Sequence, residues 1–383
     1  MPLSPNPRHR WLARSPIRQM TIECTRVGGV NLAQGICDTP VPEEVAAAAR
    51  EAIAAGRHAN APAEGLDELR LALAAKMRRH AGVDYAPEEV IVTAGATGAF
   101  HVAALALLEP GDGVIVFEPT YGYHASTLRA LGLEAVYVPL APPGWRIDPA
   151  AVEAACGPRV RAIVLNTPGN PTGAVLTRAD LEALAAIAAR HDLVVLTDEV
   201  YEHFVYDGRT HVSPASVPAL RERTVTISAL SKTFAITGWR IGWLAAPRAL
   251  TATLAALSDL VYVCAPTPLQ VGCARGLALL PDAYYRRIAT DHERKRDVLC
   301  AALHRAGLPP FVPEGSYFAL ADVSRLPGRT GTERAMALLE RVGVAAVPGE
   351  AFDRGPRGAT TARFCFGKTD ADLEAACERL ARL

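Results

Sequence analysis

The sequence predicts an α/β protein, with a mostly parallel central sheet in a large domain and a smaller α+β domain beside it. Two observations carry this prediction. Between about residues 42 and 245, short apolar runs alternate with segments of helical periodicity, a pattern typical of parallel strands covered by helices on both faces. After Pro247 the pattern becomes largely helical and then mixes short strands with helices. At 383 residues the chain is long enough for both parts.

The individual elements follow from the same periodicities. Helices are expected first at residues 43–55 and 66–80. The expected strands of the central sheet are the apolar runs 90–93, 114–117, 135–138, 162–165, 193–197 and 224–227, with helices such as 99–108 and 178–190 between them. Further on we expect a long helix over 284–306, strands over 317–320, 345–347 and 363–366, and helices over 332–342 and 370–382.

The composition excludes several classes of partner. Lys+Arg and Asp+Glu number 40 each, a balance that gives no reason to expect a nucleic acid or an anionic membrane surface as a partner. No run of 18 uncharged apolar residues is present, so we expect no membrane span. The eight cysteines are scattered without a Cys-x-x-Cys pair, which favours reduced thiols in a cytoplasmic protein and predicts no metal site.

Lysine is rare in this chain. Of the 40 basic residues only four are lysines: Lys76, Lys232, Lys295 and Lys368. If a lysine performs covalent chemistry, it is one of these four.

Distinctive residues gather where predicted strands end, which is the edge of an α/β sheet where ligands bind. Residues 93–98, Thr-Ala-Gly-Ala-Thr-Gly, precede a predicted helix, so their backbone N–H groups can bind a phosphate, although an ordinary turn has the same pattern. Residues 165–173, Leu-Asn-Thr-Pro-Gly-Asn-Pro-Thr-Gly, predict a rigid loop in which the Asn170 amide can reach a ligand oxygen. No Gly-x-Gly-x-x-Gly motif is present, so a dinucleotide site is unsupported.

Two further segments place ionisable side chains among apolar residues. Asp198, in Thr-Asp-Glu-Val-Tyr, follows an apolar run, where a carboxylate needs a cationic partner unless it is merely a helix N-cap. Lys232 lies among small and apolar residues, an environment that lowers the pKa of an amine and makes it nucleophilic enough to form a Schiff base. Arg240, eight residues further on, can make a bidentate phosphate contact.

Taken together and in order, the motifs Asn-Pro-x-Gly, Asp-x-x-Tyr, Ser-Lys and Gly-Trp-Arg resemble those of the class I/II aminotransferases of pyridoxal-phosphate (PLP) fold type I. The resemblance covers roughly residues 30–383 and is nearest to the kynurenine/glutamine/methionine transaminase subgroup. It implies PLP as cofactor, a large PLP-binding domain at residues 45–280 and a small domain formed by residues 1–44 and 281–383. It also implies a homodimer, and cis peptide bonds at Asn170–Pro171 and Glu118–Pro119.

The same resemblance assigns cofactor-binding and catalytic roles. Lys232 would form the Schiff base with PLP and later move the proton between substrate and cofactor carbons. Asp198 would pair with the pyridine nitrogen and keep it protonated, so that the ring accepts electrons. Tyr201 and Asn170 would donate hydrogen bonds to the ring oxygen, with Asn170 also bordering the substrate. Tyr121 would stack on the ring.

Phosphate and substrate contacts are implied in the same way. The backbone N–H groups of Ala96 and Thr97, together with Arg240, would hold the phosphate. Arg363, in Ala-Arg-Phe-Cys-Phe, would bind the substrate α-carboxylate. Gly35, in Gln-Gly-Ile, would line the substrate pocket.

Two positions depart from the family pattern. Many members have a Tyr five residues before the glycine that corresponds to Gly65, and that Tyr reaches the partner subunit's phosphate; here the position is Asn60. Many also have a hydroxyl three residues before the lysine, where this chain has Ala229. Ser228 and Ser231 are the candidate replacements.

The implied reaction moves an amino group from an α-amino acid to a 2-oxo acid in two half-reactions. We expect neutral or aromatic donors. An aspartate- or N-succinyldiaminopimelate-type aminotransferase is an alternative, as is a PLP-dependent carbon–sulfur β-lyase. A PLP-fold DNA-binding regulator is disfavoured, because few residues precede the first motif to build a DNA-binding domain.

Overall fold

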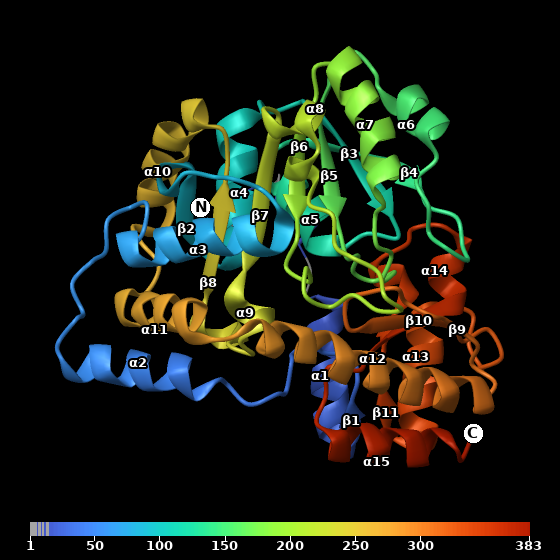
Figure 1. Ribbon diagram of the computed structural model, residues 1–383. Helices are drawn as coiled ribbons and strands as arrows, with labels where there is room; N and C mark the ends of the chain where they lie inside the picture. Colours follow the sequence, from blue (N-terminus) through green and yellow to red (C-terminus); the bar gives the residue numbers. More distant parts are fainter. Residues whose placement is uncertain (1–5, 7–8, 10, 13–14) are drawn as a thin grey trace, which may run out of the picture.

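The computed structural model describes residues 6, 9, 11–12 and 15–383. Its centre is a seven-stranded sheet in the order β2-β8-β7-β6-β5-β3-β4 (Figure 1). Neighbouring strands are parallel except around β8, which runs antiparallel to both β2 and β7. The strands are β2 (Val90–Ala94), β3 (Gly113–Glu118), β4 (Glu134–Pro139), β5 (Val160–Asn166), β6 (Val194–Asp198), β7 (Thr224–Ala229) and β8 (Ile241–Ala245). The predicted α/β class and mostly parallel sheet are confirmed.

Strand β8 is the one strand of this sheet that the apolar pattern did not predict. It lies inside the Gly-Trp-Arg-Ile-Gly-Trp motif, and Gly242 in its middle breaks the run of apolar residues. The glycine is required by packing, because a Cβ on Gly242 would lie 2.3 Å from the carbonyl carbon of Gly95.

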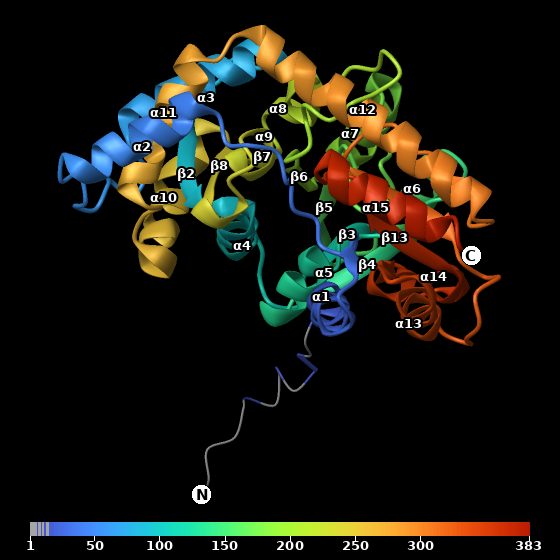
Figure 2. The same cartoon turned by 90° about the horizontal axis from the view of Figure 1, so that it is seen from below.

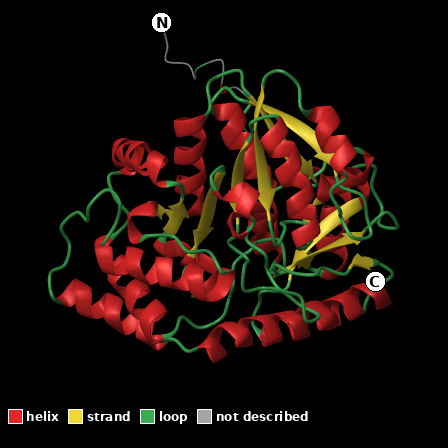
Figure 3. Cartoon of the chain, turned by 45° about the horizontal axis from the view of Figure 1, so that its top comes forward, coloured by secondary structure: helices red, strands yellow, loops and turns green. Residues whose placement is uncertain are grey.

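Helices cover both faces of the sheet (Figure 3). Successive side chains of β2 point to opposite faces of the sheet. Ile91 packs against α4 on one face, and Val90 and Val92 pack against α3 and α11 on the other. The face that contains Ile91 is covered by α4 (Gly95–Leu107), α5 (Gly122–Ala130) and α10 (Arg248–Tyr262). The opposite face is covered by α3 (Asp67–Ala81), α6 (Pro149–Ala155), α7 (Arg178–Arg190) and α11 (Thr267–Leu279).

A second, four-stranded antiparallel sheet has the order β12-β13-β10-β9. Its strands are β9 (Pro310–Phe311), β10 (Phe318–Asp322), β12 (Val347–Pro348) and β13 (Thr361–Cys365). The helices associated with it are α12 (Asp282–Arg305), α13 (Gly331–Val342), α14 (Pro356–Thr360) and α15 (Asp370–Leu380). The strand expected at 345–347 is instead two short strands, since β11 (Val344–Ala345) belongs to a different sheet from β12.

The N-terminal part of the chain lies against this C-terminal part. Strand β1 (Val30–Asn31) pairs in parallel with β11. The preceding helix α1 (Pro16–Val27), which the sequence did not predict, contacts β11 and β12. It also packs beside α13 (Figure 2). The chain then runs through α2 (Glu43–Ala54) before entering the large sheet.

Within the part of the chain described, no helix combines the length and the apolar character needed to cross a membrane. The remaining α-helices among the described residues are α8 (Pro218–Arg221) and α9 (Leu230–Thr233). The peptide bonds Glu118–Pro119 and Asn170–Pro171 are cis, as the family resemblance predicts.

Candidate active site

The candidate residues converge at one edge of the seven-stranded sheet. Strands β2, β3, β5, β6 and β7 all run in the same direction, so their carboxyl ends lie along this edge. Asp198 is the last residue of β6, and Lys232 lies in α9 directly after β7. Ala96 and Thr97 begin α4 after β2, Tyr121 follows β3, and Asn170 follows β5.

Asp198 is buried and bonded to a histidine. Its Oδ2 lies 3.0 Å from Nε2 of His124, and its Oδ1 accepts from the backbone N–H of Val200 at 3.3 Å. Among the residues that the structure describes, no lysine or arginine pairs with this carboxylate. A buried carboxylate without a full cationic partner is costly, so a protonated heterocyclic nitrogen would supply a missing charge.

Lys232 lies in a partly buried position. Its Nζ donates to the carbonyl of Gly35 at 3.3 Å and lies 5.7 Å from the ring centroid of Tyr317. Burial lowers the pKa of Lys232 to about 8. About a tenth of the amine is therefore neutral, and so nucleophilic, at pH 7, far more than for an ordinary lysine.

A cradle of backbone and guanidinium groups lies at the start of α4. This helix begins at Gly95, four residues earlier than predicted, so Ala96 and Thr97 lie in its first turn, where N–H groups have no intrahelical partner. A Cβ on Gly95 would lie 2.3 Å from Nη2 of Arg240, so that guanidinium packs directly against the helix start. Free N–H groups, a helix N-terminus and a guanidinium form a site suited to a phosphate.

Arg363 is enclosed by aromatic rings. It is 1% exposed, and its guanidinium carbon lies 4.0 Å from the ring centroid of Phe318 and 4.8 Å from that of Phe352. Its Nη1 donates to Oδ1 of Asn170 and its Nη2 to the carbonyl of Ala33, each at 2.8 Å. Its Nε is buried without a hydrogen-bond partner. A buried guanidinium with a free N–H and no carboxylate among the described residues fits a carboxylate ligand.

Gly35 lies where the N-terminal segment meets β10. Its carbonyl accepts from Lys232 and from the hydroxyl of Tyr317, the latter at 3.1 Å. A Cβ on Gly35 would lie 2.5 Å from Cζ of Phe318, so only glycine fits against this ring. Gly35 therefore contacts Lys232 through its carbonyl, and it also contacts the aromatic residues Tyr317 and Phe318.

The two tyrosines expected to contact a cofactor lie in this part of the site, where Tyr201 is buried and Tyr121 is partly buried. The ring of Tyr201 packs edge-on against Tyr317, with centroids 5.1 Å apart, and Tyr121 packs edge-on against His124 at 5.3 Å. Burial raises the pKa of Tyr121 and raises that of Tyr201 well above its usual range. Both hydroxyls therefore stay protonated and can donate hydrogen bonds.

The two departures from the family pattern have different outcomes. The Ser228 hydroxyl donates to the carbonyl of Glu199 and to the Glu202 carboxylate, so it is engaged away from the cradle and is the weaker replacement for a hydroxyl at Ala229. Ser231 is buried in α9 next to Lys232 and stays the better candidate. Asn60 lies exposed on the surface of the single chain.

Three residues at this edge were missed from the sequence: His124, Tyr317 and Phe318. His124 follows Tyr121 by three residues at the start of α5, so helical spacing could have placed it beside the site. Tyr317 and Phe318 lie in an aromatic pair at the start of β10, a weaker signal because such pairs are most often core residues.

This geometry agrees with the comparisons to known proteins. Residues 27–380 match the family model for aminotransferase class I and II. The chain belongs to this aminotransferase family. It is 40% identical over 388 residues to a protein of Mycobacterium tuberculosis described as a probable N-succinyldiaminopimelate aminotransferase, covering 98% of both chains. It is 34% identical over 385 residues to the methionine aminotransferase of Escherichia coli, covering 100% of this chain and 99% of that one.

A solved structure of N-succinyldiaminopimelate aminotransferase from M. tuberculosis superposes on this chain with a TM-score of 0.95, at 40% identity and 99% coverage of both chains. The fold is therefore that of fold type I aminotransferases, and the chain is a PLP-dependent transaminase. The residues present fit the cofactor: the cradle at Gly95 and Arg240 suits its phosphate, Asp198 its ring nitrogen and Lys232 its aldehyde.

Proposed function

We propose that this aminotransferase prefers neutral or aromatic α-amino acids as donors. The observation that carries the proposal is the buried Arg363, whose free Nε and aromatic surroundings suit the carboxylate of a substrate with an apolar side chain. Phe318 and Tyr317 supply apolar surface beside it, and no acidic side chain pairs with Arg363 among the described residues. The E. coli relative acts on methionine by its name, which supports the same preference.

The proposed roles follow from the geometry of the site. PLP, when bound, supplies an electrophilic carbon, an electron-accepting ring and a carrier for the amino group. Lys232 binds the cofactor and, with a lowered pKa, accepts and returns the proton that moves during transfer. Asp198, oriented by His124, holds the proton on the ring nitrogen.

The other residues of the site bind the cofactor and the substrate and orient them relative to each other. The N–H groups of Ala96 and Thr97, with Arg240, bind the phosphate. Tyr201 and Asn170 would donate to the ring oxygen, and Tyr121 would pack against the ring. Arg363 and Gly35 border the substrate, whose α-carboxylate pairs with the guanidinium.

A second candidate donor is N-succinyldiaminopimelate. The observation that favours it is the 40% identity over nearly the whole chain to the M. tuberculosis protein and its solved structure. This donor shares the α-carboxylate that Arg363 would bind, so the two candidates differ in how the far end of the substrate is bound.

A donor panel tests these candidates. The PLP-loaded protein is incubated with methionine, phenylalanine, kynurenine, aspartate or N-succinyldiaminopimelate, each with 2-oxoglutarate or pyruvate, and the new amino acid is measured. We expect the highest kcat/KM for methionine or an aromatic donor. A preference for aspartate or N-succinyldiaminopimelate would overturn the neutral-donor proposal. Release of pyruvate and ammonia from a cysteine conjugate without any acceptor would favour a β-lyase.

The assembly is also part of the proposal. Exposed apolar residues gather at the end of α10: Leu260, Val261 and the C-cap Val263. The adjacent Tyr262 packs near Gly98 in the first turns of α4. Such a patch suits a subunit interface, and we propose a homodimer, to be tested by light scattering.

We propose domain boundaries at residues 45–280 and at 1–44 with 281–383. All eight cysteines are free, which is consistent with the proposed cytoplasmic location.

A further inference from the structure

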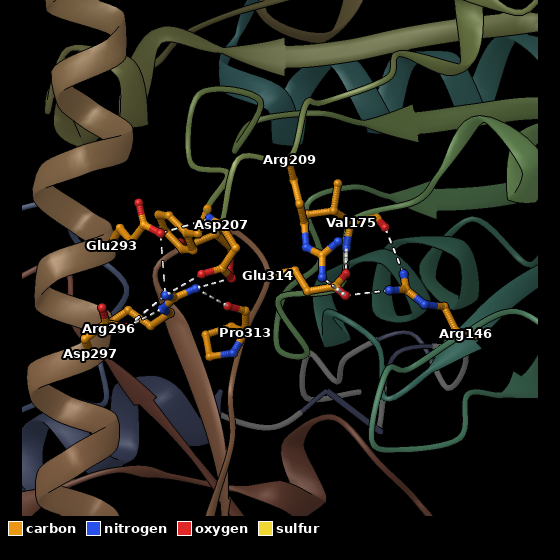
Figure 4. A network of polar contacts seen from close by, with 11 residues as sticks. Arg146, Val175, Asp207, Arg209, Glu293, Arg296, Asp297, Pro313 and Glu314 are labelled. Carbon is orange, nitrogen blue, oxygen red and sulfur yellow. Dashed lines mark hydrogen bonds and ion pairs between the residues drawn. The ribbon is translucent and has the colours of Figure 1, made fainter.

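Glu314 lies between two loops that border the proposed site (Figure 4). It follows β9, and its side chain is only 16% exposed. Its Oε1 accepts from Nη2 of Arg146 at 2.5 Å and lies 3.0 Å from Nη2 of Arg209. Its Oε2 accepts from the backbone N–H of Val175 at 3.2 Å. One carboxylate thus binds two guanidinium groups and one peptide group.

On one side these contacts hold the loop that presents Asn170. Arg146 also donates to the carbonyl of Val175 at 3.0 Å, so Arg146 and Glu314 together bind both polar groups of that residue. The backbone N–H groups of Glu314 and Gly315 donate to the carbonyl of Gly173 at 3.1 and 2.8 Å. This loop is therefore tied to the segment that enters β10.

On the other side the same segment contacts the turn that follows Tyr201. The carbonyl of Glu314 accepts from the backbone N–H of Tyr206 at 3.0 Å, and the N–H of Ser316 donates to the carbonyl of Phe204 at 2.8 Å. At Ser316 the chain adopts a left-handed conformation, with φ of 59°, and turns into Tyr317 and Phe318.

Arg296 on α12 contacts both this segment and the turn that follows Tyr201. It donates to the Asp207 carboxylate at 2.7 and 2.9 Å and to the carbonyl of Pro313 at 3.2 Å. Figure 4 shows the two arginine clusters on either side of the segment. Residues 313–316 are consequently held between the large sheet's loops and α12.

Arg363 contacts both the loop that presents Asn170 and the start of β10. It donates to Asn170 and stacks against Phe318. From these contacts we propose that Glu314 is a positioning residue for carboxylate binding, because it fixes Asn170 and Phe318 relative to Arg363. Glu314 makes no contact with Arg363 itself. The inference rests on the proposed function of Arg363.

The experiment compares two glutamate variants in the PLP-loaded enzyme. Glu314→Gln keeps an oxygen for the Val175 N–H but removes the charge that binds Arg146 and Arg209. We expect KM for donor and acceptor to rise about tenfold, with kcat changed less than about threefold and the cofactor absorbance retained. The inhibition constant of 3-phenylpropionate, a carboxylate without an amino group, should rise by the same factor.

Glu153→Gln is the matched control. Glu153 binds Arg190 at 2.5 Å and His191 at 2.6 Å, a comparable cluster between α6 and α7 that has no contact with the site. We expect this variant to keep the wild-type KM and inhibition constant. Equal values in Glu314→Gln, Glu153→Gln and the wild type would overturn the inference, and so would a loss in kcat alone.

Arg209→Gln gives a second, milder test if Glu314→Gln does not fold. It removes one cation and leaves the Arg146–Val175–Glu314 contacts in place, so the inhibition constant should rise about threefold. An unchanged constant would contradict the inference. Failure of the proposed function is seen separately, because a wild-type enzyme that binds 3-phenylpropionate no better than an Arg363→Ala variant would show that Arg363 is not the carboxylate site.

Discussion

Nη1 of Arg363 donates to Oδ1 of Asn170 over 2.8 Å, and this bond joins β13 of the four-stranded sheet to the loop after β5 of the large sheet. Both side chains are buried, and 193 residues separate them in the sequence. The amide holds one end of the guanidinium, so the free Nε defines where a further acceptor can bind. The proposed substrate site therefore depends on contact between the two sheets.

Arg363→Lys tests this site. The lysine keeps the charge but loses the planar fork that binds a carboxylate through two N–H groups. We expect kcat/KM to fall by roughly two orders of magnitude, about 2.7 kcal/mol, and by a similar factor for every donor, since all share the α-carboxylate. The cofactor absorbance should persist, because Lys232, Asp198 and Arg240 are unchanged. Near-normal activity across the donor panel would mean that another arginine binds the carboxylate.

His124→Phe tests whether the histidine orients Asp198. The substitution preserves the packing of a ring against Phe100 and Tyr121 but removes the 3.0 Å contact to the carboxylate. Because a hydrogen bond to a charged group contributes about 1.5–3 kcal/mol, we expect kcat and PLP affinity each to fall about tenfold. His191→Phe, which removes a 2.6 Å contact to Glu153 away from the site, should leave both unchanged. Equal effects of the two substitutions would contradict a role for His124.

Gly95→Ala tests the phosphate cradle. The new Cβ would lie 2.3 Å from Nη2 of Arg240 and displace that guanidinium, so we expect the PLP dissociation constant to rise at least about tenfold. Excess PLP should restore part of the activity. Gly82→Ala has a similar left-handed φ, +65° against +72°, but nothing lies within 4 Å of its Cβ. This control should lose stability by about 1–2 kcal/mol and keep its PLP affinity.

The reactivity of Lys232 should depend on pH in a defined direction. Burial lowers its pKa to about 8, so the amine is protonated and unreactive well below pH 8 and neutral above it. In the PLP-free protein, acylation of Lys232 followed by peptide mass spectrometry should rise through pH 8 and level off. An exposed lysine has a pKa of about 10.4. A midpoint near that value would mean that Lys232 is not desolvated.

Most of the large sheet was predictable because its strands are buried on both faces, which leaves continuous apolar runs such as Ile115 and Val116 in β3. The motifs at the strand ends were also predictable, because parallel strands bring their carboxyl ends to one edge. Strand β8 was missed since Gly242 interrupts its apolar run, and α4 was predicted four residues short because glycine and threonine weaken the helical pattern at its start.

The contacts that complete the site were not predictable from local pattern. His124 meets Asp198 across 74 residues, Tyr317 meets Gly35 across 282, and Arg146 meets Glu314 across 168. Periodicity reports which face of an element is buried, and it carries no information on which distant element packs there. Which of these residues meet is decided by the packing of elements that lie far apart in the sequence.

Borohydride reduction of the PLP-loaded protein shows which lysine holds the cofactor. Reduction should fix the pyridoxyl group on Lys232, located by peptide mapping. The other three lysines are buried and engaged: Lys76 pairs with Glu202 at 2.6 Å, Lys368 with Asp38 at 2.9 Å, and Lys295 donates to the carbonyl of Lys368. Recovery of the adduct on any of these three, with Lys232 unmodified, would show that Lys232 does not hold PLP.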